Sequence, residues 1–276
     1  MNGKLIVVGT PIGNLNDMSS RAIESLKSAD FIAAEDTRVT VKLLNHFGIK
    51  KPMISYFEHN KYQKGLYIRD RILAGETCVL VSDAGMPAIS DPGEELVAQC
   101  AEAGIEVSVV PGPCAFVSAL AVSGLPTGRF TFEGFLSVTK KNRVAHLESI
   151  KKEPRTMVFY EAPHKLLRTL KDLLFALGNR KIAIVRELTK IHEETVRTTL
   201  QDAIKKYESD PIKGEIVLII EGCKEEEKKS NLTLEDSIKM AQSLLDKDCT
   251  ISDVAKEVAK TTGFKKSDIY KGLIEG

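Results

Sequence analysis

Carboxylates and turn-forming residues follow several short apolar runs of this sequence. In the longest example, the run 79–81 is followed by Asp83 and then by a glycine- and proline-rich turn that extends to Gly93. Backbone N–H groups in a stiff turn can bind an anionic group, and the side chain of Asp83 can bind a positive charge. This combination predicts a small-molecule site, although an aspartate that only caps a turn would have the same neighbours.

Two more apolar runs end in the same kind of turn. The run 5–8 leads into residues 9–14, and the run 107–110 leads into residues 111–115, both rich in glycine and proline. If these runs are strands of an open sheet, their carboxyl ends form a crevice, which is the usual ligand position in that architecture. We therefore expect the three turns to meet around one ligand.

The motifs of several other chemistries are missing from the sequence. Gly9 and Gly13 lack the third glycine of a dinucleotide-binding turn, and no Gly-Lys-Ser/Thr forms a phosphate-binding loop. There is no His-Glu-x-x-His, no His/Cys set with metal-ligand spacing and no Gly-x-Ser-x-Gly. We expect no metal and no covalent nucleophile, and we favour a group-donor cofactor that needs positioning more than activation.

The elements that must position these turns alternate regularly in the first part of the chain. Short apolar runs alternate with segments of helical spacing up to about residue 115, which predicts a mostly parallel sheet covered by helices on both faces. Later runs, such as 157–160, 181–185, 195–200 and 215–220, are not all separated by helices, which favours a mixed sheet. We expect two α/β domains, 1–120 and 121–224, and a small helical module, 225–276.

Composition limits the class of protein more than its partners. The chain has 276 residues and a formal net charge of +1, which neither indicates nor excludes a nucleic acid, because a local basic face can bind phosphates. The five cysteines are scattered and form no C-x-x-C pair, so we expect a reducing compartment and no disulfide framework. No apolar run approaches membrane-spanning length, and we expect a cytoplasmic protein with no membrane contact.

The turn sequences match one known family in the same order along the chain. Taken together they resemble the branch of the tetrapyrrole methylase superfamily that methylates ribosomal RNA. The segments that carry the resemblance are 9–15 (GTPIGNL), 35–38 (EDTR), 82–93 (SDAGMPAISDPG), 110–113 (VPGP), 159–164 (FYEAPH), 186–190 (RELTK) and 214–215 (GE). Each is weak alone, but their joint order is specific and covers nearly the whole chain.

The resemblance implies a cofactor, S-adenosylmethionine, held in a cleft between two α/β domains. The residues that it assigns to the cofactor are Pro11, Asp83, Gly85, Met86, Cys114 and Ala115 in the first domain and Tyr160, Arg186, Glu187 and Gly214 in the second. Methylation of a ribose also needs a group that accepts the proton of the 2′-hydroxyl. The candidates at strand ends are Glu35, Asp36, Glu58 and His59, with Arg38 as a phosphate or carboxylate partner.

The implied activity is 2′-O-methylation of a cytidine in the decoding region of 16S rRNA, by a homodimer. Its expected partner is 16S rRNA or the small ribosomal subunit. Two alternatives remain open: a methylase of tetrapyrroles or other small molecules, and a non-catalytic ribosome-binding protein. The basic residues Lys140, Lys141 and Arg143, next to Phe135, are candidates for RNA contact, although a solvated helix start has the same composition.

Two positions depart from the family pattern. Phe57 stands where the family usually has a second histidine, and Ser137 stands where it usually has a proline. We therefore do not expect a proton relay between paired histidines. The path of the basic segment after Ser137 is not fixed by the resemblance.

Overall fold

The computed structural model describes residues 3–224, 233–245 and 250–275 of the chain. The chain divides into two compact units, Met1–Cys223 and Lys224–Gly276. Residues 225–232, at the start of the expected helical module, lie outside the described residues, as does Cys249. Among the described residues, no helix has the length and hydropathy needed to cross a bilayer.

The first lobe of the larger unit, residues 3–114, contains a five-stranded sheet in which every pair of neighbours is parallel. The strand order is β3-β2-β4-β1-β5. The strands are β1 (Lys4–Val8), β2 (Phe31–Ala34), β3 (Met53–Ser55), β4 (Cys78–Val81) and β5 (Glu106–Val110). The connecting helices are η1 (Leu15–Asp17), α1 (Ser20–Ser28), α2 (Thr37–His46), α3 (Lys61–Leu73) and α4 (Glu94–Glu102). The parallel sheet expected from the alternating pattern is confirmed.

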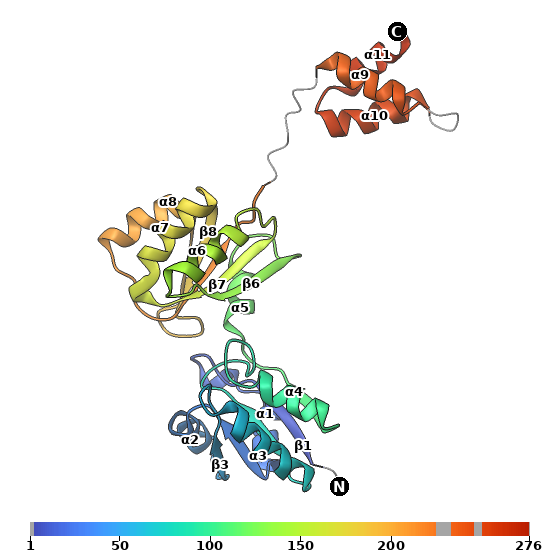
Figure 1. Ribbon diagram of the computed structural model, residues 1–276. Helices are drawn as coiled ribbons and strands as arrows, with labels where there is room; N and C mark the ends of the chain where they lie inside the picture. Colours follow the sequence, from blue (N-terminus) through green and yellow to red (C-terminus); the bar gives the residue numbers. More distant parts are fainter. Residues whose placement is uncertain (1–2, 225–232, 246–249, 276) are drawn as a thin grey trace. The chain divides into compact units, whose positions relative to one another are not determined.

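Helices cover both faces of this sheet because successive side chains of each strand point to opposite sides (Figure 1). Ile6 and Val8 of β1 belong to a buried cluster with residues of α1 and α2. Leu5 and Val7 belong to a second cluster with residues of α3 and α4. The strands therefore read as continuous apolar runs, as expected for strands that are buried on both faces.

The second lobe, residues 115–223, contains a mixed five-stranded sheet of order β6-β7-β10-β8-β9. Only β6 and β7 are parallel, and the other neighbours are antiparallel, so the predicted mixed sheet is also confirmed. The strands are β6 (Phe130–Phe135), β7 (Thr156–Glu161), β8 (Lys181–Arg186), β9 (Glu194–Thr199) and β10 (Ile216–Ile220). The helices are α5 (Ala115–Val122), α6 (Lys140–Ser149), η2 (Pro163–Lys165), α7 (Leu166–Leu177) and α8 (Leu200–Ser209).

Helices α5 and α8 are among the elements that were not expected from the pattern. Helix α5 is apolar on all sides, so its sequence shows no helical period, and it packs Ala119 and Leu120 on the second sheet. Helix α8 begins where the Thr199 hydroxyl accepts a hydrogen bond from the Asp202 N–H. The domain boundaries 1–120, 121–224 and 225–276 stay a prediction, and the first of them falls inside α5.

The described residues of the smaller unit, 233–245 and 250–275, contain three helices, α9 (Leu234–Ser243), α10 (Ile251–Thr262) and α11 (Lys266–Glu275). Their buried contacts are made by Ala241, Val254, Ala255, Val258 and Ile269. Thr233 and Asp236 form a reciprocal capping box at the start of α9. Helix α10 ends at Gly263, which has the left-handed conformation that favours glycine.

Two glycines let the turns after β1 and β5 approach closely. The N–H of Gly9 donates to the Val110 carbonyl at 3.2 Å. A methyl group added to Gly112 would lie 2.8 Å from the backbone of Gly9, which is closer than Cβ atoms come to other atoms. The two strand ends therefore share one backbone surface that admits no side chain at this point.

We predict that Gly112→Ala destabilises the chain, because the added methyl group must separate two backbone segments rather than displace a flexible side chain. The expected loss is about 1–3 kcal/mol in the free energy of unfolding. A suitable control is Gly128→Ala, because no atom lies within 4 Å of the added group. Thermal unfolding of both variants tests this, and an unchanged midpoint for Gly112→Ala would contradict it.

Candidate functional site

A cavity of about 370 Å³ lies at the carboxyl ends of the first-lobe strands. Turns of the first lobe contribute Ile12, Ala84, Ser90 and Asp91 to its lining, and Ala115 contributes from the start of α5. The second lobe contributes residues of β6, β7, β8 and β10 and of the turns beside them, among them Phe135, Tyr160, Val185, Leu188 and Gly214. The lining is mostly apolar with a few polar groups, which is typical of small-molecule sites.

The structure brings several of the predicted cofactor residues together. Ala115, Tyr160 and Gly214 line the cavity. Gly85, Met86 and Cys114 line a small adjoining hollow, which shares Asp91 and Tyr160 with the cavity. Pro11, Asp83, Arg186 and Glu187 are not among the lining residues of either. The assignment of all these residues to a cofactor stays a prediction.

The turn at 82–93 is held in place by backbone hydrogen bonds to the turn after β1. The Thr10 N–H donates to the Gly85 carbonyl at 2.9 Å, and the Gly85 N–H donates to the Thr10 carbonyl at 3.1 Å. Within the turn, Ala88 has a φ of 67° and Ser90 a φ of 63°. Such strained conformations in residues other than glycine cluster at functional sites, where the surrounding structure holds them.

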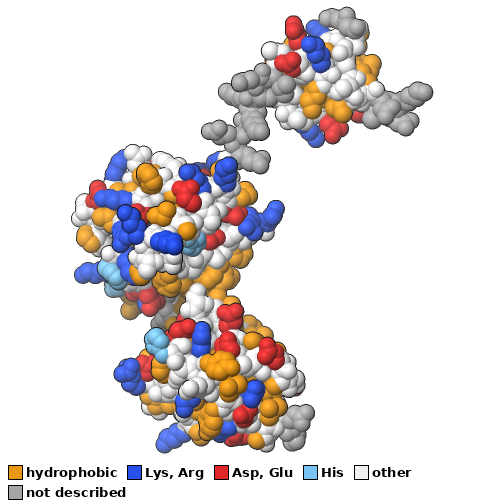
Figure 2. Space-filling model, in the orientation of Figure 1, with side chains coloured by type: hydrophobic (Ala, Val, Ile, Leu, Met, Phe, Trp, Pro, Cys, Tyr) orange, Lys and Arg blue, Asp and Glu red, His pale blue; other side chains and the backbone are white. Residues whose placement is uncertain are grey.

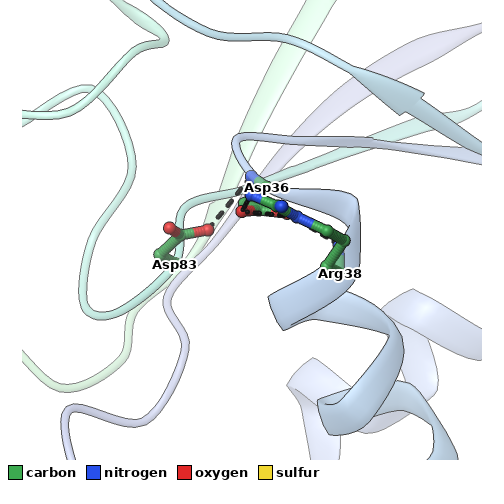
Figure 3. Close-up of polar contacts among 3 residues, drawn as sticks. All are labelled: Asp36, Arg38 and Asp83. Carbon is green, nitrogen blue, oxygen red and sulfur yellow. Dashed lines mark hydrogen bonds and ion pairs between the residues drawn. The ribbon is translucent and has the colours of Figure 1, made fainter.

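Asp83 lies beside Glu35 and Asp36 rather than in the wall of the cavity. The Asp36 N–H donates to Asp83 Oδ1 at 3.0 Å, and the Asp83 N–H donates to Glu35 Oε2 at 3.3 Å. Each of the two turns therefore supplies a carboxylate for a backbone N–H of the other. Figure 3 shows Asp83 pointing toward the start of α2, where Asp36 and Arg38 lie.

Asp36 is a helix cap that is paired with Arg38. Its Oδ1 accepts from the Arg38 N–H at 2.8 Å, and its Oδ2 lies 2.7 Å from the Arg38 guanidinium. These hydrogen bonds lower the pKa of Asp36 to about 2. A carboxylate with so low a pKa is a weak base, so among the predicted proton acceptors Asp36 is poorly suited to that role.

Three other carboxylates share the edge of the first sheet and have raised pKa values. Burial raises the pKa of Glu35 and of Asp83, because the charged form loses hydration. Burial, with repulsion from Glu35 and Asp83, raises the pKa of Asp91 to about 6. Of the three, only Asp91 lines the cavity. Sequence reasoning did not select it, although it is the second aspartate of the same turn.

Glu58 and His59 follow β3, an edge strand, and neither lines the cavity. The Glu58 carboxylate binds Lys61 Nζ at 2.7 Å and its side chain is 65 % exposed. The His59 ring packs edge-on against Phe57, and the residue is exposed. Their contacts are therefore with Lys61 and Phe57 and not with the carboxylates of Glu35, Asp83 and Asp91.

Arg186 and Glu187 have structural partners. Arg186 Nε lies 2.7 Å from Glu194 Oε2 and lines a different hollow, together with Lys206 and Tyr207. Glu187 Oε1 accepts from the Glu215 N–H at 2.9 Å, and a side chain at Gly214 would collide with the Glu187 carboxyl group. Glu187 therefore positions the turn that brings Gly214 to the cavity.

The prediction that Arg143 contacts RNA is wrong. Arg143 is only 6 % exposed. Its Nε lies 2.6 Å from Asp172 Oδ2 and its Nη2 lies 2.7 Å from Thr169 Oγ1, so it joins α6 to α7. Lys140 and Lys141, on the first turn of α6, are exposed as expected. Among the described residues, no group of His, Cys, Asp or Glu side chains could hold a metal ion.

Comparison with known proteins gives the chain a family. Residues 4–204 match the family described as Tetrapyrrole (Corrin/Porphyrin) Methylases. The protein named ribosomal RNA small subunit methyltransferase I from Synechocystis is 47 % identical over 276 residues, which is 99 % of this chain and 98 % of that protein. The protein of the same name from Thermotoga maritima is 50 % identical but covers only 80 % of this chain with 99 % of its own length.

Solved structures support the same fold. Uroporphyrin-III C-methyl transferase from Thermus thermophilus, in complex with S-adenyl homocysteine, has a TM-score of 0.55 at 21 % identity and covers 79 % of this chain and 97 % of that one. The methyltransferase CobJ has a TM-score of 0.60 at 19 % identity, covering 80 % of this chain and 95 % of that one. The chain therefore belongs to the tetrapyrrole methylase family and, within it, to the family of ribosomal RNA small subunit methyltransferase I.

Proposed function

We propose that this chain transfers a methyl group from S-adenosylmethionine to the 2′-oxygen of a cytidine in the decoding region of 16S rRNA. The observation that carries the proposal is the apolar cavity at the strand ends, in a chain whose relatives over nearly its whole length are named small-subunit rRNA methyltransferases. The cavity supports the cofactor, and the relatives support the substrate. The choice of cytidine and of the 2′-oxygen rests on the sequence resemblance.

The residues around the cavity fit the chemistry of this cofactor, which supplies an electrophilic methyl group on a sulfonium. The cavity volume of about 370 Å³ falls within the range of roughly 300–1,000 Å³ that is usual for small-molecule sites. Apolar walls such as Ile12, Val185 and Leu188 suit an adenine ring, and backbone carbonyl groups of the turns suit the positive charge. Backbone N–H groups of the turns suit the carboxylate of the methionine moiety.

A proton must leave the 2′-hydroxyl as the new C–O bond forms, and a carboxylate can accept it. Asp91 is the carboxylate with a raised pKa that lines the cavity, and its raised pKa makes it a better base than an ordinary aspartate at neutral pH. After burial, the negative charges of Glu35 and Asp83 contribute to the raised pKa of Asp91. Glu58 and His59 remain candidates only if the substrate reaches the end of β3.

The proposed partner is 16S rRNA or the small ribosomal subunit. Figure 2 shows Lys and Arg side chains gathered over the part of the molecule that contains α6, α7 and α8. Lys140 and Lys141 are exposed there and can bind phosphates. Assembly into a homodimer also stays a proposal, and light scattering at micromolar concentration tests it, because a monomer mass would refute it.

A small-molecule methylase is the second candidate, since the family name and the fold neighbours include enzymes of porphyrin and corrin substrates. An apolar cavity of this volume would accept part of a macrocycle. The two substrates differ in how binding depends on salt. Phosphate contacts release counterions, so binding of RNA weakens steeply with rising salt, whereas binding of an apolar macrocycle does not.

We predict that deleting the gene for this chain from its host removes one 2′-O-methyl group from 16S rRNA. Mass mapping of rRNA fragments, with and without the chain, measures this directly. Adding back the wild-type gene should restore the methyl group. The proposal fails if no ribose methyl group disappears, and a methylated tetrapyrrole that disappears instead would support the second candidate.

We predict that Asp83→Ala reduces methyl transfer at least tenfold while RNA binding is retained. The substitution removes the acceptor of the Asp36 N–H and so breaks one of the hydrogen bonds that hold the turn at 82–93 beside the start of α2. Incorporation of labelled methyl groups and gel-shift assays measure the two properties separately. Asp70→Ala is the matched control, since Asp70 is an exposed residue of α3 paired with Arg69. Unchanged methyl transfer would contradict the prediction.

We predict that methyl transfer falls as the pH is lowered through about 6. Asp91 must be ionised to accept a proton, and below its pKa of about 6 it is increasingly protonated. In Asp91→Asn the rate should fall about 10²- to 10⁴-fold and lose this pH dependence. Glu102→Gln, at an exposed site on α4, should keep the wild-type profile. A wild-type pH profile in Asp91→Asn would exclude Asp91 as the base.

A further inference from the structure

Strand β6 contains a bulge next to the cavity. Phe132 is opposite Val158 of β7, but the next pair joins Gly134 to Phe159, so Glu133 is an extra residue on β6. Gly134 has a φ of 62°, in the left-handed region that favours glycine. Bulges of this kind bend a strand and redirect the side chains that follow, and they are frequent beside active sites.

The bulge determines on which face of the sheet the ring of Phe135 lies. In a regular strand, residues 132 and 135 would point to opposite faces of the sheet. Because of the extra residue, Phe135 is opposite Tyr160 and lies on the same face as Phe132. Glu133 instead reaches α6, where its carboxylate lies 2.8 Å from His146 Nε2.

Phe135 is the exposed end of a row of aromatic rings. Phe116 stacks on Phe132 with 4.4 Å between ring centroids, Phe132 meets Tyr160 at 5.2 Å, and Tyr160 meets Phe135 at 5.5 Å. Tyr160 and Phe135 both line the cavity. Phe135 is nevertheless 58 % exposed. Its inner side is therefore supported by Tyr160 while much of its ring remains open to solvent.

An exposed, supported aromatic ring is suited to stacking with a flat ligand group. Proteins read single-stranded RNA mainly by stacking unpaired bases on aromatic side chains. A ribose can reach the cavity only if its nucleotide leaves the helical stack, and its base then needs a new partner. The exposed side chains of Lys140 and Lys141 follow a few residues later and can bind the adjacent phosphates.

We propose that Phe135 is the platform on which the base of the target nucleotide stacks, so that the ribose 2′-oxygen is presented to the cavity. This inference rests on the proposed function and adds a substrate-binding residue to it. Phe135 accepts no proton and contributes by positioning. The bulge at Glu133–Gly134 is what directs the ring to that place.

The first test uses kinetics with unmethylated small subunits as substrate. Phe135→Ala should lower kcat/KM for the subunit roughly 5- to 150-fold, since stacking of one base is worth about 1–3 kcal/mol. The KM for S-adenosylmethionine should stay unchanged. Phe135→Tyr should restore most of the loss, because its ring also stacks. Phe175→Ala is the matched control, since Phe175 is 91 % exposed on α7 and does not line the cavity.

The second test uses fluorescence. The chain has no tryptophan, so Phe135→Trp introduces a single reporter. Unmethylated small subunits, added with S-adenosylhomocysteine, should quench its emission, and S-adenosylhomocysteine alone should not.

The outcomes separate this inference from the proposed function. A wild-type chain that methylates the subunit, with Phe135→Ala equally active, overturns the inference alone. Quenching by S-adenosylhomocysteine alone, with a changed KM for the cofactor, would assign the ring to the adenine and also overturns it. A wild-type chain that does not methylate rRNA overturns both.

Discussion

The pair of backbone hydrogen bonds between Thr10 and Gly85 is the constraint on which the site depends. β1 and β4 are parallel neighbours, and beyond their ends the chain would normally separate into independent turns. The Thr10–Gly85 pair keeps these turns together, and the contact of Gly9 with Gly112 adds the turn after β5. Three strand ends therefore form one rigid surface before any ligand binds, which reduces the entropy that binding would cost.

The same constraint explains the electrostatics of the site. Because the turns are held together, burial raises the pKa of Glu35, Asp83 and Asp91; the charge of Asp83 adds to the rise at Glu35, and the charges of Glu35 and Asp83 add to the rise at Asp91. Isolated turns would leave each carboxylate hydrated, with an ordinary pKa. Asp36 shows the opposite case, since Arg38 neutralises it and it serves as a cap. The sheet edge therefore contains both a fixed structural carboxylate and others with raised proton affinity.

Sequence periodicity predicted the parallel sheet, because each strand there is buried on both faces and each helix has one apolar side. It also located the turns that meet at the cavity. Pairing between distant segments was not predictable in the same way. The sequence predicted Arg143 to be an exposed cation, because its partners Asp172 and Thr169 lie more than 20 positions away, on α7. Arg186 likewise has its partner on β9, and α5 has no polar face that would reveal it as a helix.

The bulge in β6 is an intermediate case. Its cause, an extra residue followed by glycine, can be read in the local sequence, but its effect on the cavity cannot. In the segment 130–135, phenylalanines stand at positions 130, 132 and 135, so the last one breaks the alternation. The glycine just before it is the residue that tolerates the required backbone conformation. An extra residue followed by glycine restores a single aromatic face, while Glu133 contacts His146 on the other side. An aromatic residue out of phase and preceded by glycine therefore indicates a ring that the fold has redirected, here into the wall of the cavity.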